Sequence, residues 1–284
     1  MRALAGWTLA GWTLAGWALA GWALAGCALA GCALAGCTRS GATAPEDALV
    51  IFAATSLRDA FTALGDDFRS THPGTELTFN FAGTQELRTQ LEHGAPVDVF
   101  ASADQLHMDE LVRTARVFDP VVFARNELVI VVALEGAARL RTLADLPSAD
   151  RVVIGAPEVP VGRYALEILD RAGSSLGADF RSRVEAKVVS RELNARQVLA
   201  KVSLGEAQAG FVYRTDAQAA QERVRIVSIP SDLSVIAEYP IAIVSGAAHP
   251  ALARAFVDLL RSASGLRALG EAGFLAPAET STTP

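Results

Sequence analysis

Hydrophobic and polar residues alternate in blocks between residues 48 and 221, where short runs rich in β-branched and aromatic residues each precede an amphipathic stretch. The first three pairs are ALVIFAA with SLRDAFTALGDDF, ELTFNFAG with TQELRTQLEHG, and VDVFASA with DQLHMDELVRTA. Three more follow: RVVIGAP with VGRYALEILDRAG, AKVVS with ELNARQVLAKVSLG, and AGFVY with RTDAQAAQ. Strand and helix therefore alternate, which predicts an α/β fold with mostly parallel sheets and right-handed crossovers.

The turns that follow these predicted strands are the expected place for a ligand. Folds of this class bind ligands at the carboxyl ends of strands, where helix N-termini point into a crevice. In FAATSLRD, Ser56 is predicted to be a helix N-cap with Asp59 three residues later, as in a capping box. In FAGTQEL, Thr84, which follows Gly83, is also predicted to be a helix N-cap.

Two later turns have the same character. A helix is predicted to begin at Val161 after two prolines, and another near Asn194 and Ala195. Helix N-termini carry unsatisfied N–H donors and the positive end of the helix dipole, so four of them directed at one crevice would hold a compact anion without any lysine or arginine. Each turn alone is also explained as an ordinary helix start. Tyr213, at the end of AGFVY, is equally explained as a packed core residue. The anion hypothesis therefore requires that all of these residues lie around one crevice.

Residues 3–38 form an uncharged run of five-residue repeats that follows a single Arg2. A five-residue period turns a helix by about 140° per repeat, so the four tryptophans spread around it and the repeat encodes bulk hydrophobicity. A short positive start, an apolar core and small residues before a cysteine are typical of a secretory signal. The alternatives are an uncleaved anchor helix and a pentapeptide solenoid, although a solenoid without polar positions would leave its apolar surface unprotected.

The only cysteines of the chain are Cys27, Cys32 and Cys37, each at the end of an LAGC unit. LAGC resembles the lipobox of bacterial lipoproteins, in which cleavage before the cysteine is coupled to its lipidation. A structural zinc site would need a second pair of ligands, which the sequence does not offer. A disulfide to the rest of the chain would need a cysteine outside this segment, and there is none. Residues 1–37 are therefore predicted to be a lipoprotein signal peptide cleaved before one of the three cysteines, and residues 38–46 a flexible linker.

Charge and motif content argue against several other functions. The net charge of −6 and the pI near 5.3 leave no basic stripe for nucleic acid. The GSSLG segment at residues 173–177 matches the serine-hydrolase elbow, but it follows a predicted helix where that motif requires a strand. Gly173 is therefore predicted to be a helix C-cap. A secreted hydrolase is a distant alternative. The sequence shows no Gly-rich phosphate loop, and its histidines are too scattered for a metal cluster: His72, His93, His107 and His249.

Several segments, in order and at similar spacing, resemble the periplasmic molybdate-binding proteins of ABC transporters. They are LVIFAATSLRDAF, FNFAGTQELRTQLEHGAPVDVFASADQLHMD, NELVIVVA, IGAPEVPVGRYALEIL, AGFVYRTDA, EYPIAIV and AFVDLLRSASGLRALGEAGF. The resemblance runs from about residue 48 to 275 and implies a two-lobed type II periplasmic-binding-protein fold, each lobe a mixed, mostly parallel sheet flanked by helices. Lobe one is expected in residues 46–124 plus 240–284 and lobe two in residues 125–239, joined by strands near NELVIVV and EYPIAIV.

The resemblance also implies the ligand and its contacts. A tetrahedral oxyanion, molybdate or tungstate, would be held between the lobes by hydroxyl and backbone amide donors of five residues: Ser56, Thr84, Val161, Ala195 and Tyr213. Threonine at position 84 departs from the serine usual in the family but keeps the hydroxyl and the N–H. Gln85 and Glu86 replace smaller residues, and a carboxylate beside a dianion would repel it unless it points away.

The resemblance further implies how the protein would work in the cell. It would be a monomer, lipid-anchored to the outer face of the membrane, that delivers its ligand to an ABC permease. No enzymatic activity, cofactor or bare metal ion is expected. The main alternative is the same fold with a different oxyanion, such as sulfate or phosphate.

Overall fold

The computed structural model describes residues 48–136 and 138–278, all within one compact unit, Thr43–Pro284. The predicted signal peptide with its three cysteines and the predicted linker lie outside the described residues. Within the described ranges, no helix is both long and apolar enough to span a membrane.

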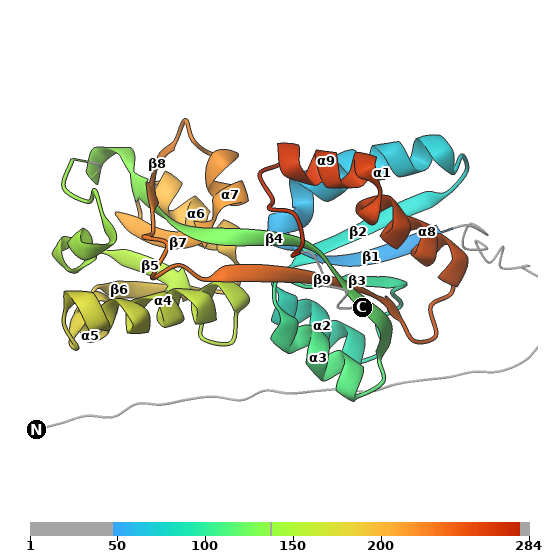
Figure 1. The fold of residues 1–284 in the computed structure, drawn as a ribbon, viewed down its shortest axis with the longest axis horizontal. Coiled ribbons are helices and arrows are strands. Elements are labelled where there is room, and N and C mark those ends of the chain that lie inside the picture. Colours follow the sequence, from blue (N-terminus) through green and yellow to red (C-terminus); the bar gives the residue numbers. More distant parts are fainter. Residues whose placement is uncertain (1–47, 137, 279–284) are drawn as a thin grey trace, which may run out of the picture. The chain divides into compact units, whose positions relative to one another are not determined.

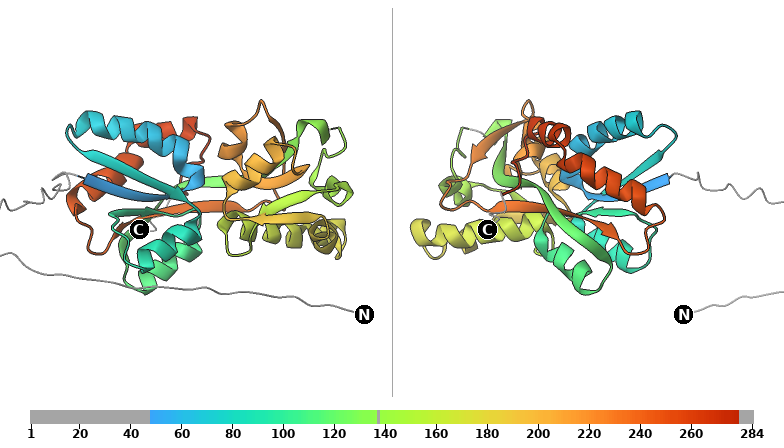
Figure 2. Two further views of the ribbon diagram at one scale, coloured as in Figure 1. Left: turned by 180° about the vertical axis from the view of Figure 1, so that it is seen from behind. Right: turned by 45° about the vertical axis from the view of Figure 1, so that its right-hand side comes forward.

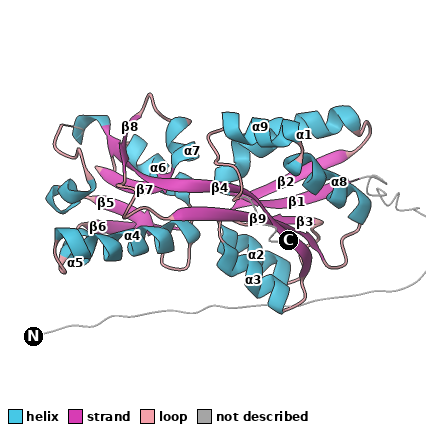
Figure 3. Cartoon of the chain, viewed as in Figure 1, coloured by secondary structure: helices cyan, strands magenta, loops and turns pink. Residues whose placement is uncertain are grey.

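A nine-stranded mixed sheet forms the centre of the described unit, in the order β2-β1-β3-β9-β4-β7-β5-β6, with β8 paired to β4 (Figure 3). It contains two parallel cores, β2-β1-β3 and β6-β5-β7, and antiparallel β9 and β4 lie between them. The predicted α/β class with mainly parallel strands in each core is confirmed. The strands are β1 (Ala48–Ala54), β2 (Glu76–Ala82), β3 (Val99–Ala101), β4 (Val117–Ala133), β5 (Val152–Gly155), β6 (Val188–Glu192), β7 (Ala209–Tyr213), β8 (Val224–Ser228) and β9 (Ile236–Val244).

Strands β4 and β9 run side by side through the middle of the described unit (Figure 1). Residues 117–127 of β4 pair with β9, whereas residues 128–133 pair with β7 and β8. Strand β4 therefore changes partners along its length. We call the part built on β1, β2 and β3 the first half, and the part built on β5, β6, β7 and β8 the second half.

Helices cover both faces of the sheet in each half (Figures 1 and 2). In the first half, α1 (Arg58–Thr71), α8 (Pro250–Arg261) and α9 (Ala263–Glu271) contact one another on one face, and α2 (Thr84–Glu92) and α3 (Gln105–Arg113) lie together on the other. The second-half helices are α4 (Pro160–Leu176), α5 (Phe180–Glu185), α6 (Ala195–Ser203) and α7 (Arg214–Gln218). The 3₁₀ turn η1 (Thr55–Leu57) connects β1 to α1.

The amphipathic patterns of the sequence explain which helix faces are buried. In α1, the residues at helical spacing 60, 61, 64 and 68 are buried, and most residues between them are exposed. The largest core cluster contains side chains of both halves and of the two long strands, including Phe61, Phe123, Ile168 and Tyr239. Smaller clusters lie under α2 and α3 and under α6 and α7. This packing fixes the helix N-termini at the ends of their strands.

The structure corrects the prediction for Gly173. Helix α4 continues through this residue to Leu176 and has its C-cap at Gly177, whose φ of 103° lies in the left-handed region that favours glycine. The GSSLG segment therefore lies in the last turn of a long helix and at its cap. A hydrolase elbow needs a sharp strand-to-helix turn, and GSSLG does not have that geometry.

Candidate functional site

A small pocket lies between the two halves, and all five residues predicted from the sequence line it. Ser56 and Thr84 come from the first half, and Val161, Ala195 and Tyr213 come from the second. The cavity volume is about 10 Å³, far below the roughly 300–1,000 Å³ of pockets for drug-sized ligands. The structure therefore brings the predicted residues together around a space suited to a compact ligand.

The lining of this pocket is uncharged. Among the described residues, its remaining lining consists of small, apolar or amide side chains: Ala54, Thr55, Ala82, Gly83, Ala103, Val159, Pro160 and Asn194. Any charge on a ligand would therefore be met by hydroxyls and backbone amides and not by an ammonium or guanidinium group. Neutral donors of this kind form strong hydrogen bonds with an anion, because the acceptor is charged.

Three helices begin at the pocket wall. Thr84 is the first residue of α2 and Ala195 the first residue of α6, and Val161 is the second residue of α4, which starts one residue earlier than predicted, at Pro160. The N–H groups in the first turn of a helix have no partner within the helix and lie at the positive end of its dipole. Three of the four predicted helix N-termini therefore converge at the pocket. At the fourth position the pocket is lined by η1, and α1 begins after it at Arg58.

Local packing explains two of these helix starts. The Asn194 side chain accepts a hydrogen bond from the Gln197 backbone N–H at 3.0 Å and is the N-cap of α6, which begins where the sequence predicts it. Helix α4 starts directly against the end of β5, where a Cβ added at Gly162 would lie 2.1 Å from the Ala156 carbonyl oxygen. Only glycine allows this close backbone approach, which places Val161 at the pocket.

The predictions that Ser56 and Thr84 are N-caps are wrong. Ser56 lies inside η1, and its Oγ is 2.9 Å from the Tyr239 hydroxyl. The N-cap of α2 is Gly83, and Thr84 Oγ1 accepts a hydrogen bond from the Ala103 backbone N–H at 3.1 Å. Both hydroxyls thus have partners far away in the sequence. Because Thr84 Oγ1 accepts this bond, its own proton is free to be donated into the pocket.

Tyr213 ends β7 and is 2% exposed. Within the described part of the chain, its buried hydroxyl has no hydrogen-bond partner. A buried donor without a partner costs roughly 1–3 kcal/mol. Burial also raises the pKa of Tyr213 well above its ordinary value, so the hydroxyl keeps its proton. The pocket therefore contains a protonated phenol that is available to a ligand.

The two unusual residues beside Thr84 do not line the pocket, and the side chains of both form hydrogen bonds. The Glu86 carboxylate accepts a hydrogen bond from the Gly83 backbone N–H at 2.9 Å at the start of α2. This is one half of a capping box, because glycine has no side chain to form the reciprocal bond. The Gln85 side chain donates to the Leu193 carbonyl oxygen at 2.8 Å and so connects the two halves. The possible repulsion by Glu86 is therefore reduced, because its charge is held by the N-terminus of its own helix.

Two arginines next to the pocket in sequence are both paired with carboxylates. Arg196 Nη2 lies 2.5 Å from Asp59 Oδ2 of the first half, and its Nε lies 3.0 Å from Asp216 Oδ1. Burial raises the pKa of Asp216 to about 6, although the nearby Arg196 charge acts in the opposite direction. Arg163 Nη2 lies 2.5 Å from Asp104 Oδ2 and forms a second ion pair between the halves.

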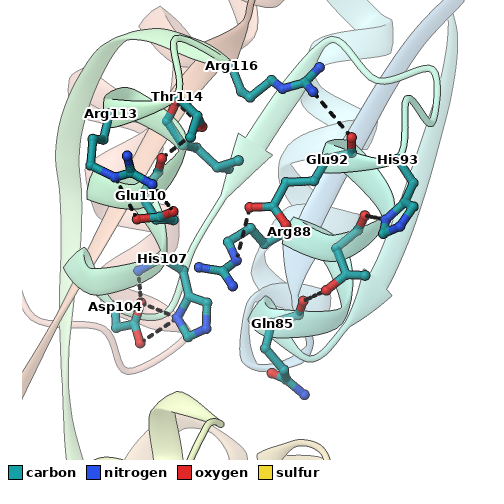
Figure 4. A network of polar contacts seen from close by, with 12 residues as sticks. Gln85, Arg88, Glu92, His93, Asp104, His107, Glu110, Arg113, Thr114 and Arg116 are labelled. Carbon is teal, nitrogen blue, oxygen red and sulfur yellow. Dashed lines mark hydrogen bonds and ion pairs between the residues drawn. The ribbon is translucent and has the colours of Figure 1, made fainter.

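The Asp104 carboxylate is fully buried and also contacts a histidine of α3, the helix that Asp104 caps (Figure 4). His107 Nδ1 lies 2.9 Å from both carboxylate oxygens, and the His107 backbone N–H donates to Oδ1. Burial raises the pKa of Asp104, but hydrogen bonds and charge from His107, together with the Arg163 charge, outweigh it and lower the pKa overall. His107 thus has a structural partner, and the described residues contain no group of side chains arranged to hold a metal ion.

The contacts between the halves were not found from the sequence. Arg163, Arg196 and Tyr239 lie in segments whose patterns predict only helices or strands. Their partners are 59, 137 and 183 residues away along the chain. Residues so far apart along the chain leave no local signal of their pairing in the sequence.

Comparison with known proteins identifies the family of the chain. The family described as bacterial extracellular solute-binding protein matches residues 49–275. The molybdate-binding protein ModA of Mycobacterium tuberculosis (strain ATCC 25618 / H37Rv) is 40% identical over 232 residues, which cover 81% of this chain and 85% of that protein. ModA of Escherichia coli (strain K12) is 31% identical over 242 residues, covering 82% and 91%.

A solved structure shows the same fold. The periplasmic molybdate-binding protein of Azotobacter vinelandii matches with a TM-score of 0.71 at 18% sequence identity, covering 81% of this chain and 99% of that one. The resemblance drawn from the sequence motifs is therefore confirmed at the level of both sequence and fold.

Proposed function

The chain belongs to the bacterial extracellular solute-binding protein family, and we propose that it captures molybdate or tungstate outside the cytoplasm and delivers it to an ABC permease. The observation that carries this proposal is the uncharged pocket in which Ser56, Thr84, Val161, Ala195 and Tyr213 converge from both halves. The 40% identity to a protein named for molybdate binding supports this choice of ligand. Binding and release require no chemical step and no cofactor.

We propose that the halves act as two lobes, with lobe one in residues 46–124 plus 240–284 and lobe two in residues 125–239. The change of β4 partners near residue 128 supports this division. The distribution of the proposed ligand residues also supports it, since two lie in the first half and three in the second. The anion would then be held only while the two lobes are together, and separating them would release it.

The energetics of a dianion explain the choice of donors. Molybdate is doubly charged at neutral pH, and each hydrogen bond to a charged acceptor is worth roughly 1.5–3 kcal/mol. After desolvation and ordering costs, several such bonds leave roughly 8–12 kcal/mol, which corresponds to micromolar to nanomolar affinity. Uncharged donors would bind the fully deprotonated oxyanion and still allow its release when the lobes separate.

Calorimetric titration with molybdate, tungstate, sulfate and phosphate tests the proposed ligand. Molybdate and tungstate have the same charge and similar size, so both should bind with micromolar or tighter Kd. Sulfate is smaller and cannot reach every donor at once, and each buried donor left unpaired costs about 1–3 kcal/mol, so we expect it to bind at least roughly tenfold more weakly. Sulfate or phosphate binding as tight as molybdate binding would favour the alternative ligand and reject this assignment.

We also propose that the mature protein is a monomer anchored by lipid at Cys27, Cys32 or Cys37. The LAGC units that end at these cysteines support the proposal. Cells expressing the full chain should incorporate a radioactive fatty acid into it, and replacing all three cysteines with alanine should abolish the labelling. Unchanged labelling of the triple variant would show that the lipid is attached elsewhere or that the lipoprotein assignment is wrong.

A further inference from the structure

Tyr239 contacts side chains from both halves of the pocket. It lies in β9 opposite Ala124 of β4 and is fully buried. Its hydroxyl is 2.9 Å from Ser56 Oγ of the first half. Its ring packs against the ring of Tyr213 in the second half, with centroids 5.6 Å apart and planes inclined by 71°. Tyr239 thus touches both of the side chains that would donate from η1 and from β7.

The protons available to this pair determine the direction of the hydrogen bond. A serine hydroxyl has one proton, so Ser56 can donate into the pocket only if it accepts the bond from Tyr239. Donation by Tyr239 also gives the proton of a buried phenol an acceptor. Burial raises the pKa of Tyr239 well above its ordinary value despite the hydrogen bond with Ser56, so the phenol keeps the proton that it donates.

We propose that Tyr239 is a positioning residue of the oxyanion site: its hydroxyl donates to Ser56 Oγ and turns the serine proton into the pocket, while its ring supports the ring of Tyr213. Tyr239 itself does not line the pocket in the described structure. It would therefore act on affinity through Ser56 and Tyr213. This inference rests on the proposed oxyanion binding and identifies a determinant of affinity outside the pocket lining.

The Tyr239→Phe variant tests the inference with molybdate as the probe. The substitution keeps the ring packing and removes the donor, so the Ser56 hydroxyl is free to rotate. We expect the Kd for molybdate to rise about three- to tenfold, the range for loss of one oriented neutral hydrogen bond. Tyr164→Phe is the matched control, because Tyr164 is also buried and, in the described residues, its hydroxyl has no hydrogen bond to a pocket-lining residue. This control should bind molybdate like the wild type.

A double-mutant cycle separates positioning from a general structural effect. In the Ser56→Ala background the hydroxyl to be oriented is absent, so adding Tyr239→Phe should leave the Kd of the single variant within about twofold. An equal loss of affinity in both backgrounds, or wild-type affinity of Tyr239→Phe alone, overturns the inference. The unliganded melting temperature of each variant shows whether it is folded. Failure of the wild-type protein to bind any oxyanion would instead overturn the proposed function together with this inference.

Discussion

The Gly83→Ala variant should bind molybdate roughly a hundredfold or more weakly than the wild type, with little change in the fold of either half. The Gly83 backbone has φ −63° and ψ 141°, which alanine adopts without strain. A Cβ at this position would, however, lie 2.3 Å from the Leu193 carbonyl oxygen of the second half. Because that oxygen is backbone, the clash is relieved mainly by moving the halves apart.

Separating the halves removes the donors of one side from the ligand. An anion held at Ser56 and Thr84 would lose Val161, Ala195 and Tyr213, and the loss of even two charge-assisted bonds amounts to about 3 kcal/mol or more. That free energy corresponds to the expected hundredfold effect. Alanine is also a poorer N-cap than glycine, so the unliganded variant should be less stable by no more than about 1 kcal/mol.

The Gly270→Ala variant is the control for this substitution. Gly270 lies in α9, and a Cβ added there meets no atom within 4 Å. Its affinity for molybdate should equal that of the wild type, and its stability should be equal or slightly greater, because alanine favours helix. Calorimetry gives the Kd and thermal unfolding gives the stability of both variants. Wild-type affinity of Gly83→Ala would show that the contact with Leu193 does not accompany ligand binding.

The Tyr213→Phe variant should bind molybdate about ten- to a hundredfold more weakly, because it loses one hydrogen bond to a charged acceptor. The surroundings of the Tyr213 hydroxyl also determine how the substitution should change the stability of the unliganded protein. The Tyr213 hydroxyl is buried and has no partner among the described residues, so phenylalanine strands no donor or acceptor. The melting temperature without ligand should therefore stay the same or rise.

The opposite pair of results would assign Tyr213 to the core. A lowered melting temperature without ligand, together with unchanged molybdate affinity, would show that the hydroxyl has a structural partner. Measuring both quantities on the same preparation distinguishes the two roles. Tyr164→Phe again provides the control, since it removes a phenol hydroxyl from a buried tyrosine beside Arg163.

The sequence was sufficient for the features that depend on local patterns. β-branched runs followed by amphipathic stretches predicted the alternating strands and helices, because side-chain periodicity and burial follow directly from backbone geometry. The start of α6 was predicted near Asn194 and Ala195, since a short polar side chain before a helical pattern is a local signal. The start of α4 was predicted within one residue for a similar reason, as proline favours the first turn of a helix.

Features that depend on distant contacts could not be predicted in this way. Ser56 and Thr84 have the residue types and positions of N-caps, but their hydroxyls bond to Tyr239 and to the Ala103 backbone, which only the folded sheet brings near. Gly173 similarly looks like a helix end, but apolar packing of α4 continues beyond it and the helix ends at Gly177. The motifs shared with molybdate-binding proteins identified the five pocket residues, which single N-cap signals did not distinguish from ordinary helix starts.

Anomalous diffraction at the molybdenum absorption edge, from crystals of the protein grown with molybdate, tests most directly whether this pocket is the oxyanion site. We predict a single strong peak between the two halves, with oxygens within hydrogen-bond distance of Ser56, Thr84, Val161, Ala195 and Tyr213. A peak at another place on the protein, or a peak in contact with only one half, would contradict the proposed site.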